Sequence, residues 1–159
     1  MAKLFHRLTG LSMVVAVLIP GVADAAVPTS SAYYGRWTVS EERPVFTARG
    51  RLYKTIDIAP CGSDFCGVSV TDAGRCGTVM FRFLGHRANS PDSLRGHARW
   101  GSGRKNVVIW GYDFEAANPA DRGLSLSIGD GYDFGERSEN VPTFQSRYHR
   151  LGAARCIAR

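Results

Sequence analysis

Aromatic and β-branched residues alternate with polar residues in short runs along most of this chain, and segments with helical spacing are scarce. The segment Gly123–Gly129 is the clearest case, with three large aliphatic side chains on one face and serines on the other. Gly50–Ala59 shows a similar alternation, with Leu52, Ile56 and Ile58 on one face. Since a period of two is typical of half-buried strands, the pattern predicts an all-β fold.

Clusters of Gly, Pro, Asn and Asp divide the predicted strands from one another. The turn cluster at residues 60–64 is expected to close a hairpin, and the stretch from Gly85 to Gly103 is expected to be an irregular loop. The tetrapeptide GYDF occurs twice, at Gly111–Phe114 and Gly131–Phe134, and we interpret it as shared turn chemistry rather than a structural repeat. The strands expected are Gly35–Ser40, Gly50–Ala59, Phe65–Thr71, Cys76–Leu84, Asn106–Tyr112, Gly123–Gly129 and Phe144–Leu151.

The N-terminal residues 1–25 have the three parts of a cleaved secretory signal peptide: basic residues, an apolar run and a small-residue site ending at Ala25. The apolar run, from Leu11 to Ile19, is shorter than the roughly 20 residues that cross a bilayer, so a membrane anchor is not expected. No cysteine directly follows the site to carry a lipid. The sequence therefore predicts a periplasmic or secreted protein with a flexible lead at 26–32 and a single domain at 33–159.

Export changes the interpretation of the four cysteines, because thiols in an oxidising compartment form disulfides. Four cysteines allow three pairings, which spacing alone does not resolve. If Cys61 and Cys66 end the two facing strands of a hairpin, their Cα atoms come within disulfide distance, which leaves Cys76 to pair with Cys156. Zinc binding and a thioredoxin-like role are not favoured, because there is no CxxC motif.

No catalytic signature emerges from the remaining polar residues. The chain has no GxSxG, no HExxH and no phosphate-binding glycine loop. Two loop histidines, His86 and His97, leave a nuclease as a remote alternative, while His149 lies on the last strand. Acidic residues around the second GYDF (Asp130, Asp133 and Glu136) fit a turn better than a calcium loop. We therefore expect no catalytic residues, no metal and no cofactor.

The formal charge of the chain is +6; the signal removes two cationic side chains and one anionic one, leaving +5. The basic residues are scattered singly rather than in a block, which favours a solvated basic surface over a dedicated anion-binding patch. No nucleic-acid partner is expected, and the protein is expected to be a monomer.

The motif Gly35-Arg36-Trp37, followed by IDIAPCG and FCGVSV and closed by Tyr148-His149-Arg150, resembles a family of exported bacterial proteins of unknown function. The resemblance implies a small antiparallel lipocalin-like (calycin) barrel, although the family's closing Trp-Thr-Arg is Tyr-His-Arg here. It also implies that Arg150 stacks on Trp37 and that both are structural residues.

A small barrel can hold one ligand or fill its interior with its own side chains. The first expectation is a binding protein for a small apolar or amphipathic ligand, with Trp37, Phe81, Phe83 and Trp110 as possible lining. The alternative is an envelope interaction protein whose basic surface contacts an anionic polymer or a protein partner. A secreted hydrolase or nuclease is the remote third possibility.

Overall fold

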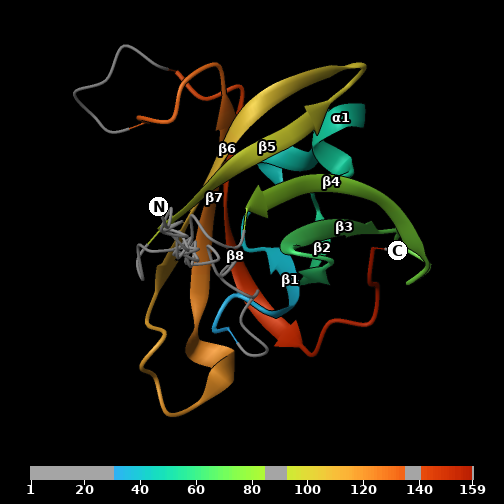
Figure 1. The fold of residues 1–159 in the computed structure, drawn as a ribbon. Helices are drawn as coiled ribbons and strands as arrows, with labels where there is room; N and C mark the ends of the chain where they lie inside the picture. Colours follow the sequence, from blue (N-terminus) through green and yellow to red (C-terminus); the bar gives the residue numbers. More distant parts are fainter. Residues whose placement is uncertain (1–30, 85–92, 135–140, 159) are drawn as a thin grey trace, which may run out of the picture.

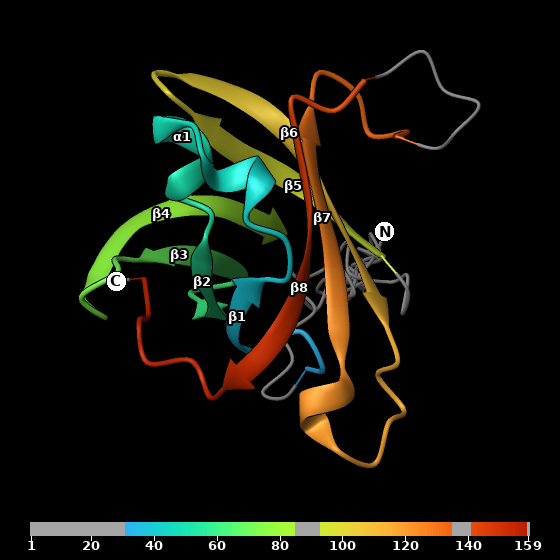
Figure 2. The ribbon, with the colours of Figure 1, turned by 180° about the vertical axis from the view of Figure 1, so that it is seen from behind.

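The computed structural model describes residues 31–84, 93–134 and 141–158. Eight antiparallel strands form one closed barrel in which each strand pairs with the next along the chain, and β8 pairs with β1 (Figures 1 and 2). The strands are β1 (Gly35–Val39), β2 (Thr55–Cys61), β3 (Asp64–Val70), β4 (Cys76–Leu84), β5 (Ser93–Trp100), β6 (Gly103–Tyr112), β7 (Gly123–Gly129) and β8 (Phe144–Gly152). Within the described ranges, three short helices accompany them: η1 (Arg43–Val45), α1 (Ala48–Arg51) and η3 (Pro119–Asp121).

This architecture confirms the prediction of an all-β, single-domain antiparallel barrel, and it is compatible with a lipocalin-like barrel. The predicted signal peptide and most of the predicted lead lie outside the described residues. None of the helices in the described ranges is long and apolar enough to cross a membrane.

The barrel interior is occupied by the chain's own apolar side chains. Trp37, Ile56 and Ile58 are fully buried. The rings of Phe81 and Phe83 pack with centroids 5.2 Å apart. Burial of each such side chain stabilises the fold by about 1.5–3 kcal/mol, so this cluster is the main source of stability.

Five predicted strands differ in extent from the structure, namely β1, β2, β3, β6 and β8, and β2 differs most. The segment Gly50–Ala59 starts too early, because Thr47 caps α1 by accepting a hydrogen bond from the Gly50 amide (3.0 Å), and β2 begins only at Thr55. Leu52 is consequently 49% exposed instead of facing the core. The hairpin turn is also shorter than predicted: β2 runs to Cys61 and β3 starts at Asp64.

The expectation of an irregular loop from Gly85 to Gly103 is wrong over its second half, because β5 runs from Ser93 to Trp100. The inward face of β5 includes Gly96 and Ala98, both too small to give a hydrophobic alternation. Gly96 has to be small: a Cβ there would lie 2.2 Å from the Arg82 carbonyl oxygen and 2.7 Å from the Phe83 ring. Because close packing requires glycine at this position, β5 lacks the alternation of large apolar residues by which strands are predicted.

The alternation along Cys76–Leu84 predicts that Val79, Phe81 and Phe83 share one face, but a register shift between Gly67 and Val68 changes the faces of β4. Gly67 pairs with Phe81 and Val68 with Val79, so Met80 is an extra residue on β4. Phe81 and Phe83 face the core as expected, but Val79 does not and is 39% exposed.

The C-terminal segment crosses the outside of β2 and β3 (Figure 2). There Cys156 packs with Val68 and Val70 in a second, small apolar cluster. The structure contains the disulfides Cys61–Cys66 and Cys76–Cys156, which is the pairing that the hairpin geometry favours. Two disulfides are typical of proteins from oxidising, extracellular environments.

Candidate functional site

The outer face of β4, β5 and β6 carries a groove of about 1140 Å³, which we call the basic groove. Arg95, His97 and Arg99 project from the same face of β5, because they are spaced by two. Arg82 pairs with His97 from β4, and Arg104 pairs with Arg99 from β6. The barrel thus gathers four arginines from three strands onto one surface.

The floor of the basic groove has an apolar part. Val79 is 39% exposed there, whereas Phe81 and Ala98 also line the groove but are only 2% exposed, because their side chains face the core. The ring of Tyr132 lies at one side, 5.9 Å from the guanidinium carbon of Arg95, a cation–π contact that holds this arginine at the groove. A surface that combines an apolar floor with guanidinium groups suits a ligand with both an apolar and an anionic part.

Positive charge in the basic groove is barely neutralised by the described residues. None of the groove's lining residues is acidic. An ion pair joins Arg82 to Asp64, with a nitrogen–oxygen distance of 3.5 Å, and the Arg82 side chain is 59% exposed. Arg99 and Arg104 sit directly opposite each other, and like charges in such positions destabilise a sheet.

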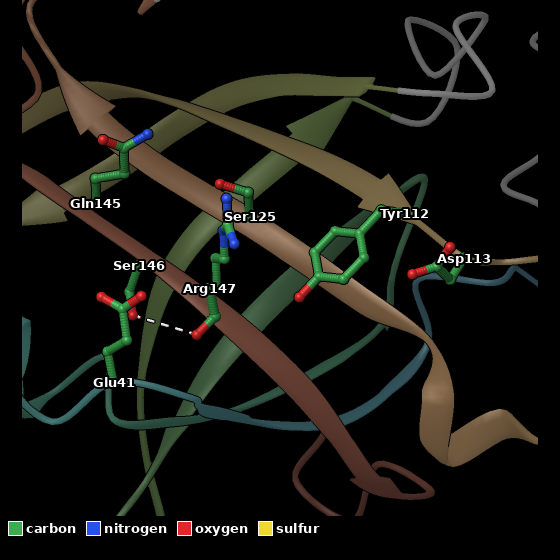
Figure 3. A pocket seen from close by; sticks show the side chains of 7 residues that line it. All are labelled: Glu41, Tyr112, Asp113, Ser125, Gln145, Ser146 and Arg147. Carbon is green, nitrogen blue, oxygen red and sulfur yellow. Dashed lines mark hydrogen bonds between the residues drawn. The ribbon is translucent and has the colours of Figure 1, made fainter.

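A second groove, of about 860 Å³, lies on the outer face of β6, β7 and β8; we call it the polar groove (Figure 3). It contains side chains from the β1–η1 loop, the end of β6 and the two strands after it. Its lining residues are Glu41, Tyr112, Asp113, Ser125, Gln145, Ser146 and Arg147.

The sequence-predicted structural pair lies at the end of the barrel near the N-terminus of β1. Trp37 pairs with Arg150 in the β1–β8 register, so both side chains share one sheet face. The Trp37 indole is buried and donates to the Tyr33 carbonyl (2.9 Å). The Arg150 guanidinium donates to the Tyr34 carbonyl (3.2 Å). Its Nε is buried and has no hydrogen-bond partner among the described residues, and a Cβ on Gly35 would lie 2.8 Å from it.

The stack of Arg150 on Trp37 stays a prediction of the resemblance. Among the described residues, the cation–π contact found is that of Arg95 with Tyr132. The guanidinium of Arg150 nevertheless packs against the backbone of Tyr34 and Gly35 at the start of β1, as expected of a residue that stabilises the fold.

The other candidate residues of the sequence are not gathered into one centre. His97 lies on β5 and His149 on β8, where its Nδ1 is 3.4 Å from the Ser40 hydroxyl; His86 and Glu136 lie outside the described residues. Asp130 pairs with Lys105 (2.7 Å). Across the described ranges, no group of three or more His, Cys, Asp or Glu side chains could hold a metal ion.

The four aromatic residues suggested as ligand lining separate into two groups. Trp37, Phe81 and Phe83 belong to the packed core, where they contact other side chains. Trp110 is partly buried on the outer face, between Ser93 of β5 and Ser125 of β7 in the strand register. The lining of the basic groove was missed because its arginines are far apart in sequence and the strand that carries three of its basic side chains was not predicted.

Comparison of the chain with protein-family models, with curated proteins and with solved structures finds no match.

Proposed function

We propose that this protein is an exported, non-enzymatic barrel that binds a small amphipathic anion in the basic groove. The supporting observation is the combination of four guanidinium groups with an apolar floor on one surface that has no acidic lining residue. Guanidinium groups bind carboxylate and phosphate through paired, charge-assisted hydrogen bonds. The exposed side chain of Val79 offers contact to an alkyl chain at the same time.

Export to the periplasm or the medium is part of the proposal. It is supported by the sequence pattern of residues 1–25 and by the two disulfides. The GxW motif at Gly35–Trp37 and Arg150 on the closing strand support membership of the lipocalin-like family of exported bacterial proteins.

Binding of three probes tests the proposed function. Dodecyl phosphate, used below its critical micelle concentration, has both an anionic head and an alkyl chain; dodecyl maltoside has only the chain, and inorganic polyphosphate only the charge. We expect saturable calorimetric binding of dodecyl phosphate at least about tenfold tighter than of dodecyl maltoside, because the difference reports charge-assisted hydrogen bonds worth about 1.5–3 kcal/mol. Equal binding of the two amphiphiles contradicts the proposal.

A matched pair of variants locates the site. Arg95→Gln with Arg99→Gln removes two groove charges, while Arg43→Gln with Arg75→Gln removes two exposed charges elsewhere. The first variant should bind dodecyl phosphate at least about tenfold more weakly, and the second should change the affinity less than about twofold. If both variants lose affinity equally, net charge rather than the groove is responsible.

An anionic envelope polymer is the second candidate ligand, favoured by the row of basic residues along β5. From Arg95 to Arg99 the strand rises about 13 Å, long enough to contact several charges of a polymer. If polyphosphate binds as tightly as dodecyl phosphate and its affinity falls steeply with salt, this alternative replaces the amphiphile. Native mass spectrometry of the purified protein, followed by lipid extraction, adds an independent readout, since an amphiphile-binding protein should carry such a molecule.

A further inference from the structure

The polar groove has a chemistry opposite to that of the basic groove. It carries two carboxylates, Glu41 and Asp113, and one guanidinium, Arg147. An anion is therefore disfavoured, and a purely apolar ligand would meet only Tyr112 as a large apolar surface. The groove needs a ligand that is neutral overall and able to donate and accept hydrogen bonds at many points.

The lining offers every type of hydrogen-bonding group. The carboxylates accept, Arg147 donates, and Gln145 and Ser125 do both. Within the described part of the chain, the side chains of Glu41, Asp113, Gln145 and Arg147 make no hydrogen bond or ion pair. Sugar hydroxyl groups, which both donate and accept, match this set.

The backbone positions from which these side chains project are fixed by the fold. The Ser40 amide donates to the Arg147 carbonyl (2.8 Å), which holds the loop bearing Glu41 beside β8. Asp113 has φ of 55° in a turn closed by the Ala116 amide (2.9 Å). The neighbouring Phe114 anchors that turn through an edge-to-face contact with Tyr33 at 4.8 Å. Because the backbone of the groove is already ordered, binding costs the entropy of ordering its side chains but little backbone entropy.

Tyr112 supplies an aromatic surface in the same groove. Its ring covers Gly123, where a Cβ would lie 2.0 Å from the ring carbon Cζ, and its hydroxyl donates to the Tyr148 carbonyl (3.4 Å). The side chain remains 39% exposed. The apolar C–H face of a sugar ring can pack on such a fixed aromatic ring while its hydroxyls reach the polar side chains.

We infer that the polar groove is a carbohydrate-binding site for a neutral oligosaccharide. Its volume of about 860 Å³ falls within the roughly 300–1,000 Å³ of ligand pockets. Figure 3 shows the two carboxylates toward opposite ends of the groove, with Arg147 and Tyr112 between them. That spacing fits contacts to an extended chain of sugar rings. The site is independent of the basic groove and of the function proposed for it.

Chemical-shift titration of the ¹⁵N-labelled full chain tests the inference with three neutral probes: chitotetraose, cellotetraose and maltotetraose. We expect at least one probe to give saturable shifts at millimolar concentration, confined to amides around the groove such as those of Ser125 and Gln145. The inference is overturned if none of the three gives saturable shifts there.

Two double variants that leave the net charge unchanged provide the control. Glu41→Ala with Arg147→Ala removes polar groups of the groove, while Glu42→Ala with Arg75→Ala removes an exposed pair outside it. The first should weaken the responsive tetrasaccharide at least about tenfold, and the second less than about twofold. Equal effects, or competition between the tetrasaccharide and saturating dodecyl phosphate, refute a separate carbohydrate site.

Discussion

The substitution Asp57→Ala tests how the C-terminal segment is fixed to the barrel. Asp57 projects outward from β2 but is fully buried beneath that segment. Its carboxylate accepts two hydrogen bonds from the Arg36 guanidinium, at 2.7 and 2.8 Å. It also accepts from the backbone amides of Arg155 (2.8 Å) and Cys156 (2.7 Å). One side chain therefore joins β1, β2 and the C-terminus.

The expected loss in free energy of unfolding follows from the unpaired groups that remain after Asp57→Ala. Arg36 has a side chain only 15% exposed, so without Asp57 it keeps a largely buried charge with no opposite charge beside it. Removing one partner of a buried ion pair costs about 3–5 kcal/mol. The two backbone N–H groups can regain water if the tail moves, so the total should stay near that range. For a domain of this size, the loss corresponds to a melting temperature lower by roughly 10–20 °C.

Urea unfolding followed by tryptophan fluorescence measures this cost. Asp72→Ala is the matched control, since Asp72 pairs with Lys54 at 3.1 Å and the two side chains are 69% and 41% exposed. An exposed pair contributes about 0–1 kcal/mol, so the control should unfold almost like the wild type. If Asp57→Ala loses less than about 1 kcal/mol, the assignment of a buried ion-pair lock is refuted.

Three further predictions concern the same framework. Burial opposes ionisation of Asp57, but Arg36 and the two amides outweigh it and lower its pKa below the ordinary 3.8. The stability that Asp57 contributes is therefore present above pH 3.8 and lost on further acidification. In acid unfolding curves, the difference in free energy of unfolding between the wild type and Asp57→Ala should narrow below that pH. Replacing Cys76 and Cys156 by Ser, a separation of 80 residues, should cost about 4.5 kcal/mol by denaturant unfolding, against about 2 for the 5-residue hairpin disulfide; equal losses contradict the loop-entropy argument. Burial raises the pKa of Tyr148, whose hydroxyl donates to the Tyr53 carbonyl (2.7 Å), so the folded state keeps this phenol neutral and the free energy of unfolding falls above about pH 10 as the unfolded chain ionises. Tyr148→Phe should cost about 1–2 kcal/mol at neutral pH and weaken that alkaline decline. If stability still falls as steeply at alkaline pH in the variant, Tyr148 is not its source.

Strands with large apolar side chains on one face could be predicted from the sequence. The bounds of β4 and β7 are those expected, because Phe and Leu at alternate positions mark the inward face. β5 could not be found in this way, since close packing against Arg82 and Phe83 requires glycine at position 96. The outward face of β5 does carry a signal: Arg95, His97 and Arg99 alternate with small residues. This is a strand-like period of two in basic side chains rather than in apolar ones.

The candidate sites were harder to predict because barrel closure creates them. Arg82 and Arg95 are 13 positions apart in sequence, and the β4–β5 register places them on one surface. Glu41 and Arg147 are more than one hundred positions apart, and they meet because β8 returns to pair with β1. Sequence spacing carries no information on such contacts, so scattered charges in a β chain do not imply a scattered surface.

The outer surface of the barrel separates the contacts that stabilise the C-terminal segment from the two grooves proposed to bind ligands. The apolar core fills the interior, and both proposed grooves open on the outside of the barrel. The tail covers the outer side of β2 and β3, where Asp57, Val68 and Val70 hold it and the Cys76–Cys156 disulfide fixes its end. Both grooves lie on the remaining strands, β4 to β8. Because these tail contacts and the two grooves share no side chain, a substitution in the tail contacts should leave ligand affinity unchanged. The effects of substitutions in the two regions on the free energy of unfolding should add.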